Sequence, residues 1–297
     1  MAKIVTKRKS DTLITRLVIH FDESSHIDNA YGYKPKIASK VLNWALNELI
    51  PMDHRSRYLV TCGGFINADL PSELADVKVI TSVSKKEINA ITNFVESICH
   101  SAIDITLLRK LSSRFEYLTL GFDLFEKNKR MREVQLVTLI DLQKNLYHWT
   151  GKFYPTPSEE KCLIRFPELS SQFIKCGKDR VFVMGCHDLS AFNPRCQKRT
   201  GGWKRELRDE IQNLAQSFKP NIALQHPHNT ITYRTWNTSW SGLKGLVPTV
   251  TDYVSGIRYG LKHENKEMTI SDVCEHSMGG NVMDFMIREA KIKTILK

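Results

Sequence analysis

Five segments of this sequence join an apolar stretch to a short polar cluster, as strands do where they end at a reactive site. In open α/β sheets, ligands bind beyond the carboxyl ends of the strands. Four of the five clusters carry His or Asp, so we expect an enzyme or a ligand sensor. The clusters are His20-Phe21-Asp22-Glu23, Thr61-Cys62-Gly63-Gly64, Gly121-Phe122-Asp123, Gly185-Cys186-His187-Asp188 and Gln225-His226-Pro227-His228.

The His226-Pro227-His228 segment is the sharpest short pattern. Residues i and i+2 of an extended segment point to the same side, so the two imidazoles could bind one Zn²⁺, Mn²⁺ or Fe²⁺ ion. His187 and Asp188 would join them from the preceding strand end. General acid–base catalysis, a phosphate contact and a purely structural role remain open for both histidines.

The first third of the chain alternates between strand and helix patterns. We predict strands at 13–21, 57–61 and 77–81, with helices at 37–49 and 85–100. This order predicts a small parallel, Rossmann-like α/β unit over residues 1–111. The unit lacks GxGxxG and GxxxxGK[ST], so no motif supports a dinucleotide or P-loop nucleotide site.

The pattern changes at about residue 112, where a second unit running to residue 297 begins. An antiparallel meander is predicted first, followed by alternating helices and strands and a C-terminal helical extension. The predicted strands are 115–122, 133–142, 146–153, 181–186, 221–225 and 249–259, and the predicted helices are 159–174 (interrupted at Pro167), 203–218, 232–246 and 269–290.

From residue 115 to about 230, this order of elements resembles the ribonuclease H-like superfamily. The resemblance implies a mixed sheet and places essential acids at Asp123 and Asp188. A third group would come from a later element, with His226, His228, Glu160 and Glu168 as candidates. Two Mg²⁺ ions about 4 Å apart would need such shared carboxylates to stabilise the attacking and leaving oxygens of a phosphoryl displacement. The resemblance therefore implies a divalent metal, Mg²⁺ or Mn²⁺ first and Zn²⁺ second. A departure from the family pattern is that Leu124 and Phe125, instead of small residues, follow Asp123.

The charge balance favours a polyanionic partner. The formal net charge is +11 and the sequence pI is about 9.3, and six basic residues against one acid lie between residues 195 and 208. We therefore expect nucleic acid as a partner, with a solvated loop and helix face as the alternative. The residues expected to contact phosphates are Lys152, Arg195, Lys198, Arg199, Lys204, Arg205 and Arg234.

The seven cysteines form no CxxC pair, which favours reduced thiols in a cytoplasmic protein over a disulfide framework. Cys62 is a candidate nucleophile, although no partner histidine is identifiable by spacing, and a buried structural role is the alternative. No apolar run approaches the roughly 20 residues of a membrane helix, so no membrane partner is expected. The oligomeric state is left open.

Taken together, these patterns predict a metal-dependent phosphodiesterase, most simply a nuclease acting on DNA or RNA. Asp123, Asp188 and His228 are the expected catalytic residues, and His187 and His226 complete the expected metal ligands. Two alternatives remain open. One is a catalytically silent nucleotide or nucleic-acid binding module, and the other is a small-molecule metallohydrolase built on the His226/His228 pair.

Overall fold

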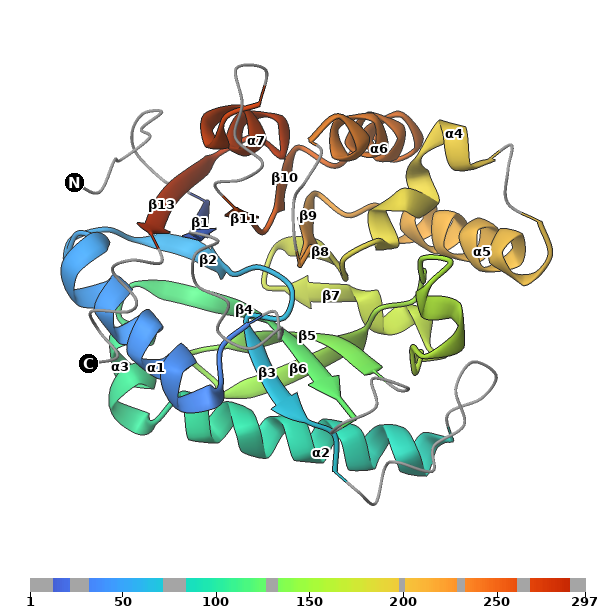
Figure 1. Ribbon diagram of the computed structural model, residues 1–297. Helices are drawn as coiled ribbons and strands as arrows, with labels where there is room; N and C mark the ends of the chain where they lie inside the picture. The colour runs from blue at the N-terminus through green and yellow to red at the C-terminus, as the bar shows by residue number, and fades with distance from the viewer. Residues whose placement is uncertain are drawn as a thin grey trace.

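Two β-sheets packed face to face, with helices on their outer faces, form the framework of the protein (Figure 1). The computed structural model describes residues 13–21, 32–71, 84–126, 133–197, 201–228, 233–260 and 268–288. No helix in these segments is long and apolar enough to cross a membrane.

The first sheet contains eight strands in the order β11-β1-β2-β4-β5-β6, with β13 also pairing with β1 and β3 with β4. The pairs β4–β5 and β5–β6 are antiparallel, and the other pairs are parallel. The strands are β1 (Ile14–Phe21), β2 (Ser56–Val60), β3 (Ile66–Asp69), β4 (Phe115–Phe125), β5 (Glu133–Asp141), β6 (Leu146–Gly151), β11 (Arg258–Gly260) and β13 (Val282–Arg288).

The second sheet contains five strands in the order β12-β10-β9-β8-β7. Its three central strands are parallel, and the two outer ones pair antiparallel with their neighbours. The strands are β7 (Phe173–Cys176), β8 (Asp179–Met184), β9 (Ile222–Gln225), β10 (Asp252–Ser255) and β12 (Met278–Gly279).

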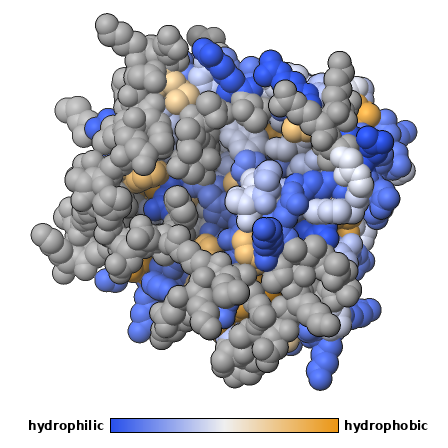
Figure 2. Space-filling model, turned by 45° about the vertical axis from the view of Figure 1, so that its right-hand side comes forward, coloured by the Kyte–Doolittle hydropathy of each residue, from blue (hydrophilic) through white to orange (hydrophobic). Residues whose placement is uncertain are grey.

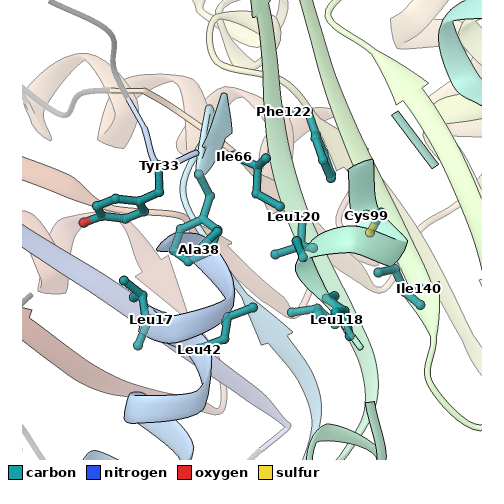
Figure 3. Packing of buried hydrophobic residues seen from close by; sticks show 14 of the residues in the cluster. Leu17, Tyr33, Ala38, Leu42, Ile66, Cys99, Leu118, Leu120, Phe122 and Ile140 are labelled. Atoms are coloured by element: carbon teal, nitrogen blue, oxygen red, sulfur yellow. The ribbon is translucent and has the colours of Figure 1, made fainter. Parts of the chain in front are cut away.

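Helices cover the outer face of each sheet. Those on the first sheet bury an apolar stripe against alternate residues of β4, as Leu42, Cys99, Leu118 and Leu120 illustrate (Figure 3). A capping box between Ser84 and Glu87 fixes the start of the longest helix there. The helices are α1 (Pro35–Trp44, continued by a π-helical turn Ala45–Leu49), α2 (Lys85–Ala102) and α3 (Ile105–Ser112) on the first sheet, and α4 (Pro194–Gln197), α5 (Trp203–Phe218), α6 (Tyr233–Leu246) and α7 (Ile270–His276) along the second.

The strict alternation of side chains along β4 and β5 decides what lies between the sheets. Leu118, Leu120 and Phe122 face the helices, whereas Tyr117 faces the second sheet. The same parity continues to the end of β4 and directs Asp123 into the space between the two sheets. The carboxylate is 1% exposed, although the strand continues for two further residues to Phe125.

A buried ion pair ties the first strand to the last. Arg16 of β1 lies opposite Asp284 of β13, and its Nε and Nη2 donate to the two carboxylate oxygens at 2.7 and 2.6 Å. Its Nη1 donates to Ser277 Oγ and to the Ser255 carbonyl. One guanidinium therefore joins both sheets.

We expect Asp284→Ala to lower the free energy of unfolding by about 3–5 kcal/mol, because it leaves a buried guanidinium without its counter-charge. Urea denaturation measures this change. Asp69→Ala is the matched control, since the Asp69–Lys34 pair is exposed to solvent and contributes little. Equal losses in the two variants would contradict the role given to Asp284.

Several elements differ from those the sequence predicts. Residues 159–174 form two short 3₁₀ turns and the start of β7 instead of a helix. Of the described residues in the expected closing helix, which end at 288, only 270–276 are helical. The rest of that stretch includes β13, which pairs with β1. The meander at 115–151 and the helices at 85–102 and 203–218 are confirmed. The strand expected at 77–81 lies outside the described residues.

The ribonuclease H-like resemblance is wrong, because it places the strand after the meander in the same sheet. Strands β8 and β9 instead form the centre of the second sheet, which packs against the meander face to face. The fold is mixed α/β, as predicted, but with two sheets. The expected boundary at residues 111/112 falls inside the first sheet, where β2 pairs with β4.

Candidate active site between the two sheets

A row of polar side chains crosses the first sheet and faces the second. Asn67 of β3 lies opposite Asp123 of β4, which lies opposite Gln135 of β5. Lys152 follows β6 and continues the row, since its backbone N–H donates to the Gln135 carbonyl at 2.9 Å. Cross-strand partners have Cβ atoms about 5 Å apart, so these four side chains are neighbours on one face.

The turn after β8 brings a cysteine to this row. Asp188 begins a 3₁₀ turn there and is fully buried. Its Oδ1 accepts the backbone N–H groups of Phe153 and Tyr154 at 3.0 and 2.8 Å, and its Oδ2 accepts that of Gly185 at 2.7 Å. Burial raises the pKa of Asp188 to about 7, although these bonds oppose the shift. Asp188 thus holds the Cys186 turn against the segment that carries Lys152.

The two histidines after β9 occupy different environments. His226 is buried, and its ring lies 3.1 Å from the Met184 carbonyl and 2.9 Å from Thr119 Oγ1. Burial lowers the pKa of His226 to about 4, so the ring is neutral and links β8 to β4. His228 Nε2 instead lies 2.7 Å from Asp123 Oδ1.

Cys186 and His228 are neighbours, since the His228 backbone N–H donates to Cys186 Sγ at 3.5 Å. Burial alone would raise the pKa of the Cys186 thiol, but hydrogen bonding and charge from His187 and His228 hold it well below its usual value. Burial would lower the pKa of His228, but the Asp123 carboxylate and Cys186 raise it well above the ordinary range. A thiolate beside an imidazolium is the reactive form of a cysteine nucleophile.

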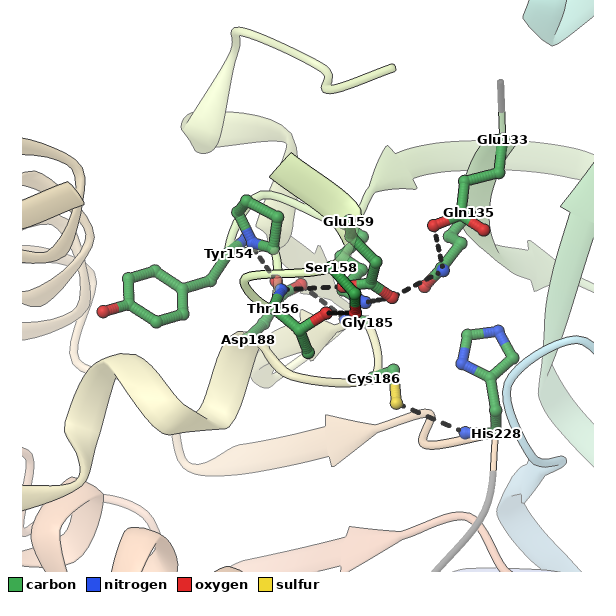
Figure 4. A network of polar contacts seen from close by, with 12 residues as sticks. Glu133, Gln135, Tyr154, Thr156, Ser158, Glu159, Gly185, Cys186, Asp188 and His228 are labelled. Atoms are coloured by element: carbon green, nitrogen blue, oxygen red, sulfur yellow. Dashed lines mark hydrogen bonds and ion pairs between the residues drawn. The ribbon is translucent and has the colours of Figure 1, made fainter. Parts of the chain in front are cut away.

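A buried lysine completes the charged groups around the thiol. The Lys152 side chain is 0% exposed, and its Nζ lies 2.5 Å from Glu159 Oε1. Figure 4 shows Glu159 in the polar network that also contains Cys186 and His228. Burial lowers the pKa of Lys152, but Cys186 and Glu159 outweigh this effect and raise it. Glu159 also accepts the Thr156 N–H at 2.7 Å, and although burial opposes this, its pKa falls to about 2. Lys152 is therefore an ammonium ion held near Cys186.

The backbone at two glycines after β2 lies close to Asp123 and to the His226 carbonyl. A Cβ on Gly64, whose φ is +55°, would lie 2.3 Å from Asp123 Oδ2, and one on Gly63 would lie 2.2 Å from the His226 carbonyl oxygen. The glycines thus border a small pocket of about 10 Å³, the space of about one water molecule. Its walls are formed by Gly63, Gly64, Asp123, Gln135, Leu136, Val137, Gly185, Cys186, His226 and His228.

Three of the predicted site residues, Asp123, His226 and His228, line the pocket, but not as metal ligands. Across the described residues, no three His, Cys, Asp or Glu side chains are grouped so that they could hold a metal ion. Asp123 is paired with His228, Asp188 is bonded to backbone amides, and His226 is bonded within the protein. His187 lies against the Trp236 ring, with ring centroids 5.5 Å apart. The predicted divalent metal site at Asp123, Asp188, His187, His226 and His228 is therefore wrong.

Cys186 itself was missed. It stands in the Gly185-Cys186-His187-Asp188 cluster, in which only His187 and Asp188 were assigned a chemistry. A Gly-Cys pair directly after an apolar strand was the signal available. Cys62, the cysteine that was considered, is buried, and burial raises its pKa to about 12, so it is a poor nucleophile.

The residues expected to bind phosphate are not grouped in this pocket. Lys152 is buried, and Lys204 pairs with Glu160 at 2.5 Å. Arg195, Arg205 and Arg234 are exposed, whereas Lys198 and Arg199 lie outside the described residues. Figure 2 shows a mainly hydrophilic surface on the described part of one face. Binding of nucleic acid stays a prediction.

No protein-family model and no curated protein matches the chain. Solved structures that match include a mutant of a nitrilase-superfamily amidase from Nesterenkonia, with 10% identity, coverage of 85% of this chain and 78% of that one, and a TM-score of 0.44. A CN-hydrolase superfamily protein from Xanthomonas campestris matches at 10% identity, with 84% and 77% coverage and a TM-score of 0.44. A carbon–nitrogen hydrolase from Helicobacter pylori matches at 11% identity, with 89% and 78% coverage and a TM-score of 0.44.

The prediction of a metal-dependent nuclease is wrong. The carboxylates and imidazoles assigned to the metal are bonded within the protein instead. The metallohydrolase alternative fails with the metal site, since no three suitable side chains of the described residues are grouped to hold an ion.

Proposed function

We propose that the protein is a cysteine hydrolase that cleaves the carbon–nitrogen bond of an amide through a thioester. The observation that carries the proposal is the meeting of Cys186 and the His228–Asp123 pair at one pocket, with the buried Lys152 ammonium behind Cys186. Nitrogen leaves an amide only when it is protonated, and the His228 imidazolium stands beside the thiolate to supply that proton.

In the first half of the reaction, the Cys186 thiolate attacks the carbonyl carbon. The developing oxyanion is stabilised by the Lys152 ammonium, which Glu159 and burial keep in place. His228 then gives its proton to the nitrogen, the C–N bond breaks, and the amine or ammonia departs. The acyl group remains on Cys186 as a thioester, and His228 is left neutral.

In the second half, neutral His228 removes a proton from water, and the resulting hydroxide attacks the thioester. The C–S bond breaks, the carboxylic acid departs, and the thiolate–imidazolium pair is restored. Asp123 keeps Nε2 of His228 bonded throughout, which leaves Nδ1 to exchange the proton. Each cycle consumes one amide and one water and needs no other reactant.

The proposal predicts an acyl adduct on Cys186. Protein mixed with short aliphatic amides and quenched with acid within one turnover should carry the acyl mass on the peptide that contains Cys186, because thioesters survive acid. Peptide mass spectrometry makes the measurement, and hydroxylamine should remove the adduct. Turnover of amides without an adduct, or an adduct on another residue, would contradict the mechanism.

A further inference from the structure

The turn that carries Cys186 is held by its backbone on both sides of the thiol. Before the thiol, the Gly185 N–H donates to Asp188 Oδ2 at 2.7 Å. After it, the Cys186 carbonyl accepts a hydrogen bond from Gln225 Nε2 at 2.6 Å. Asp188 belongs to the same turn, whereas Gln225 is the last residue of β9 and lies opposite Met184 of β8. The Gln225 side chain therefore ties the turn to the neighbouring strand.

Gln225 acts on Cys186 from outside the pocket. Its side chain is 0% exposed, and it is not one of the residues that form the pocket walls. A ligand that reaches the Cys186 thiol does not meet the Gln225 amide. Any effect of Gln225 on the reaction must therefore pass through the position of Cys186.

The direction of the Gln225 amide is set by two side chains behind it. Trp240 Nε1 donates to Ser255 Oγ at 3.0 Å, and an indole N–H can only donate. The single hydrogen of the Ser255 hydroxyl is then left for Gln225 Oε1, which lies 2.6 Å away. Because the amide oxygen faces Ser255, the amide nitrogen must face the Cys186 carbonyl. An amide turned the other way would bring two acceptors together at that carbonyl.

The three side chains form a buried relay that ends at the nucleophile. Trp240 of α6, Ser255 of β10 and Gln225 are all buried. Ser255 is also the cross-strand neighbour of Gln225, and its backbone carbonyl accepts Arg16 Nη1 at 2.9 Å. Hydrogen bonds that water does not reach are strong, and each link of the relay fixes the orientation of the next.

We propose that Gln225 is a positioning residue that, with Ser255 and Trp240 behind it, holds the Cys186 backbone so that the thiol stays beside His228. This inference rests on the proposed function, because it concerns the nucleophile of that reaction. A displacement of about 1 Å at a reacting group can lower a rate by about 100-fold. Residues that never meet the substrate thus keep the thiol and the proton donor together.

Alkylation of Cys186 tests the inference without amide chemistry. Gln225→Met keeps the length of the side chain but removes the donor, so Cys186 can move away from His187 and His228, which lower its pKa. We expect alkylation by iodoacetamide to slow at least about tenfold at pH 6 and to recover at about pH 9.5, where even an ordinary thiol is ionised. Mass spectrometry of the peptide that contains Cys186 measures both rates. A ratio of the two rates equal to that of the wild-type protein would overturn the proposal.

Gln212→Met is the matched control. Gln212 Nε2 also donates to a backbone carbonyl, that of Ala191 at 2.7 Å, in the 3₁₀ turn that follows Cys186. Its removal should lower thermal stability but leave the ratio of the alkylation rates at the two pH values unchanged. The same change of this ratio in Gln212→Met and Gln225→Met would mean a general loosening of the turn and would overturn the role given to Gln225.

Ser255→Ala tests the relay with a smaller change, which decides the matter if Gln225→Met does not fold. The Gln225 amide loses the hydroxyl that orients it, so alkylation of Cys186 at pH 6 should slow by about threefold, as for one weakened hydrogen bond. An unchanged rate ratio in Ser255→Ala would overturn the proposal.

The double variant tests whether Ser255 acts through Gln225. Ser255→Ala should add nothing to the effect of Gln225→Met on alkylation, and effects that multiply would reject the relay. These shifts in a protein that hydrolyses no amide would uphold the positioning of Cys186 and reject the proposed reaction.

Discussion

Replacing Cys186 by alanine should reduce amide hydrolysis by about 10⁴-fold or more, to the level that the remaining polar groups provide without a nucleophile. The loss follows because attack on the carbonyl carbon requires a thiolate, and the pKa of Cys186 is lowered. Burial instead raises the pKa of Cys62, Cys99, Cys162, Cys176 and Cys274. The kcat for ammonia release, measured with a coupled assay, checks the expectation.

Cys62→Ala is the matched control for this variant. Cys62 also follows a strand that leads to the pocket and is also buried, but burial raises its pKa to about 12. We expect its removal to leave kcat within a few-fold of the wild-type value. Thermal unfolding should be measured for both proteins, so that loss of fold is separated from loss of chemistry. A Cys186→Ala protein that retains turnover would reject the nucleophile, and equal losses in both variants would point to packing.

The meander and the polar strand ends could be predicted from the sequence because both depend on local patterns. Alternating apolar residues at 115–151 specify strands, and the tight turn at Asn145 joins two of them. Asp123 and His228 were expected together, but as parts of a metal site, and Cys186 was not expected there. The site arises across two sheets, and a period-two pattern does not say which sheet a strand joins.

The wrong predictions also concern residues whose structure depends on contacts with distant parts of the chain. Residues 282–288 carry apolar side chains that suit either a helix or a strand, and pairing with β1 decides for the strand. Lys152 is indistinguishable from a surface lysine in the sequence, and only the burial of its side chain against Glu159 makes it part of the site. Likewise, the pairing of Asp123 with His228 instead of a metal depends on a contact between residues 105 positions apart.

His228→Gln should lower kcat for amide hydrolysis by about 10²–10⁴-fold, the range of a lost general acid–base group. Its effect on the reactivity of the thiol should be smaller. Both His187 and His228 hold the pKa of Cys186 down, so removing one leaves part of the shift in place. Alkylation by iodoacetamide at pH 6 should therefore slow by about tenfold, because loss of a neighbouring cation raises the pKa of the thiol and reduces the thiolate fraction.

The neighbouring histidine provides the control that separates catalysis from structure. His226→Gln removes a neutral ring that bonds to Thr119 and Met184, so it should lower stability while leaving the pH dependence of alkylation unchanged. In the wild-type protein, alkylation should depend on pH less steeply between pH 6 and 8 than that of an ordinary thiol, since the pKa of Cys186 is held well below its usual value. A rate that climbs tenfold per pH unit up to about pH 8.5 would mean an ordinary thiol. The ion pair, and with it the proton that His228 must deliver, would then be absent.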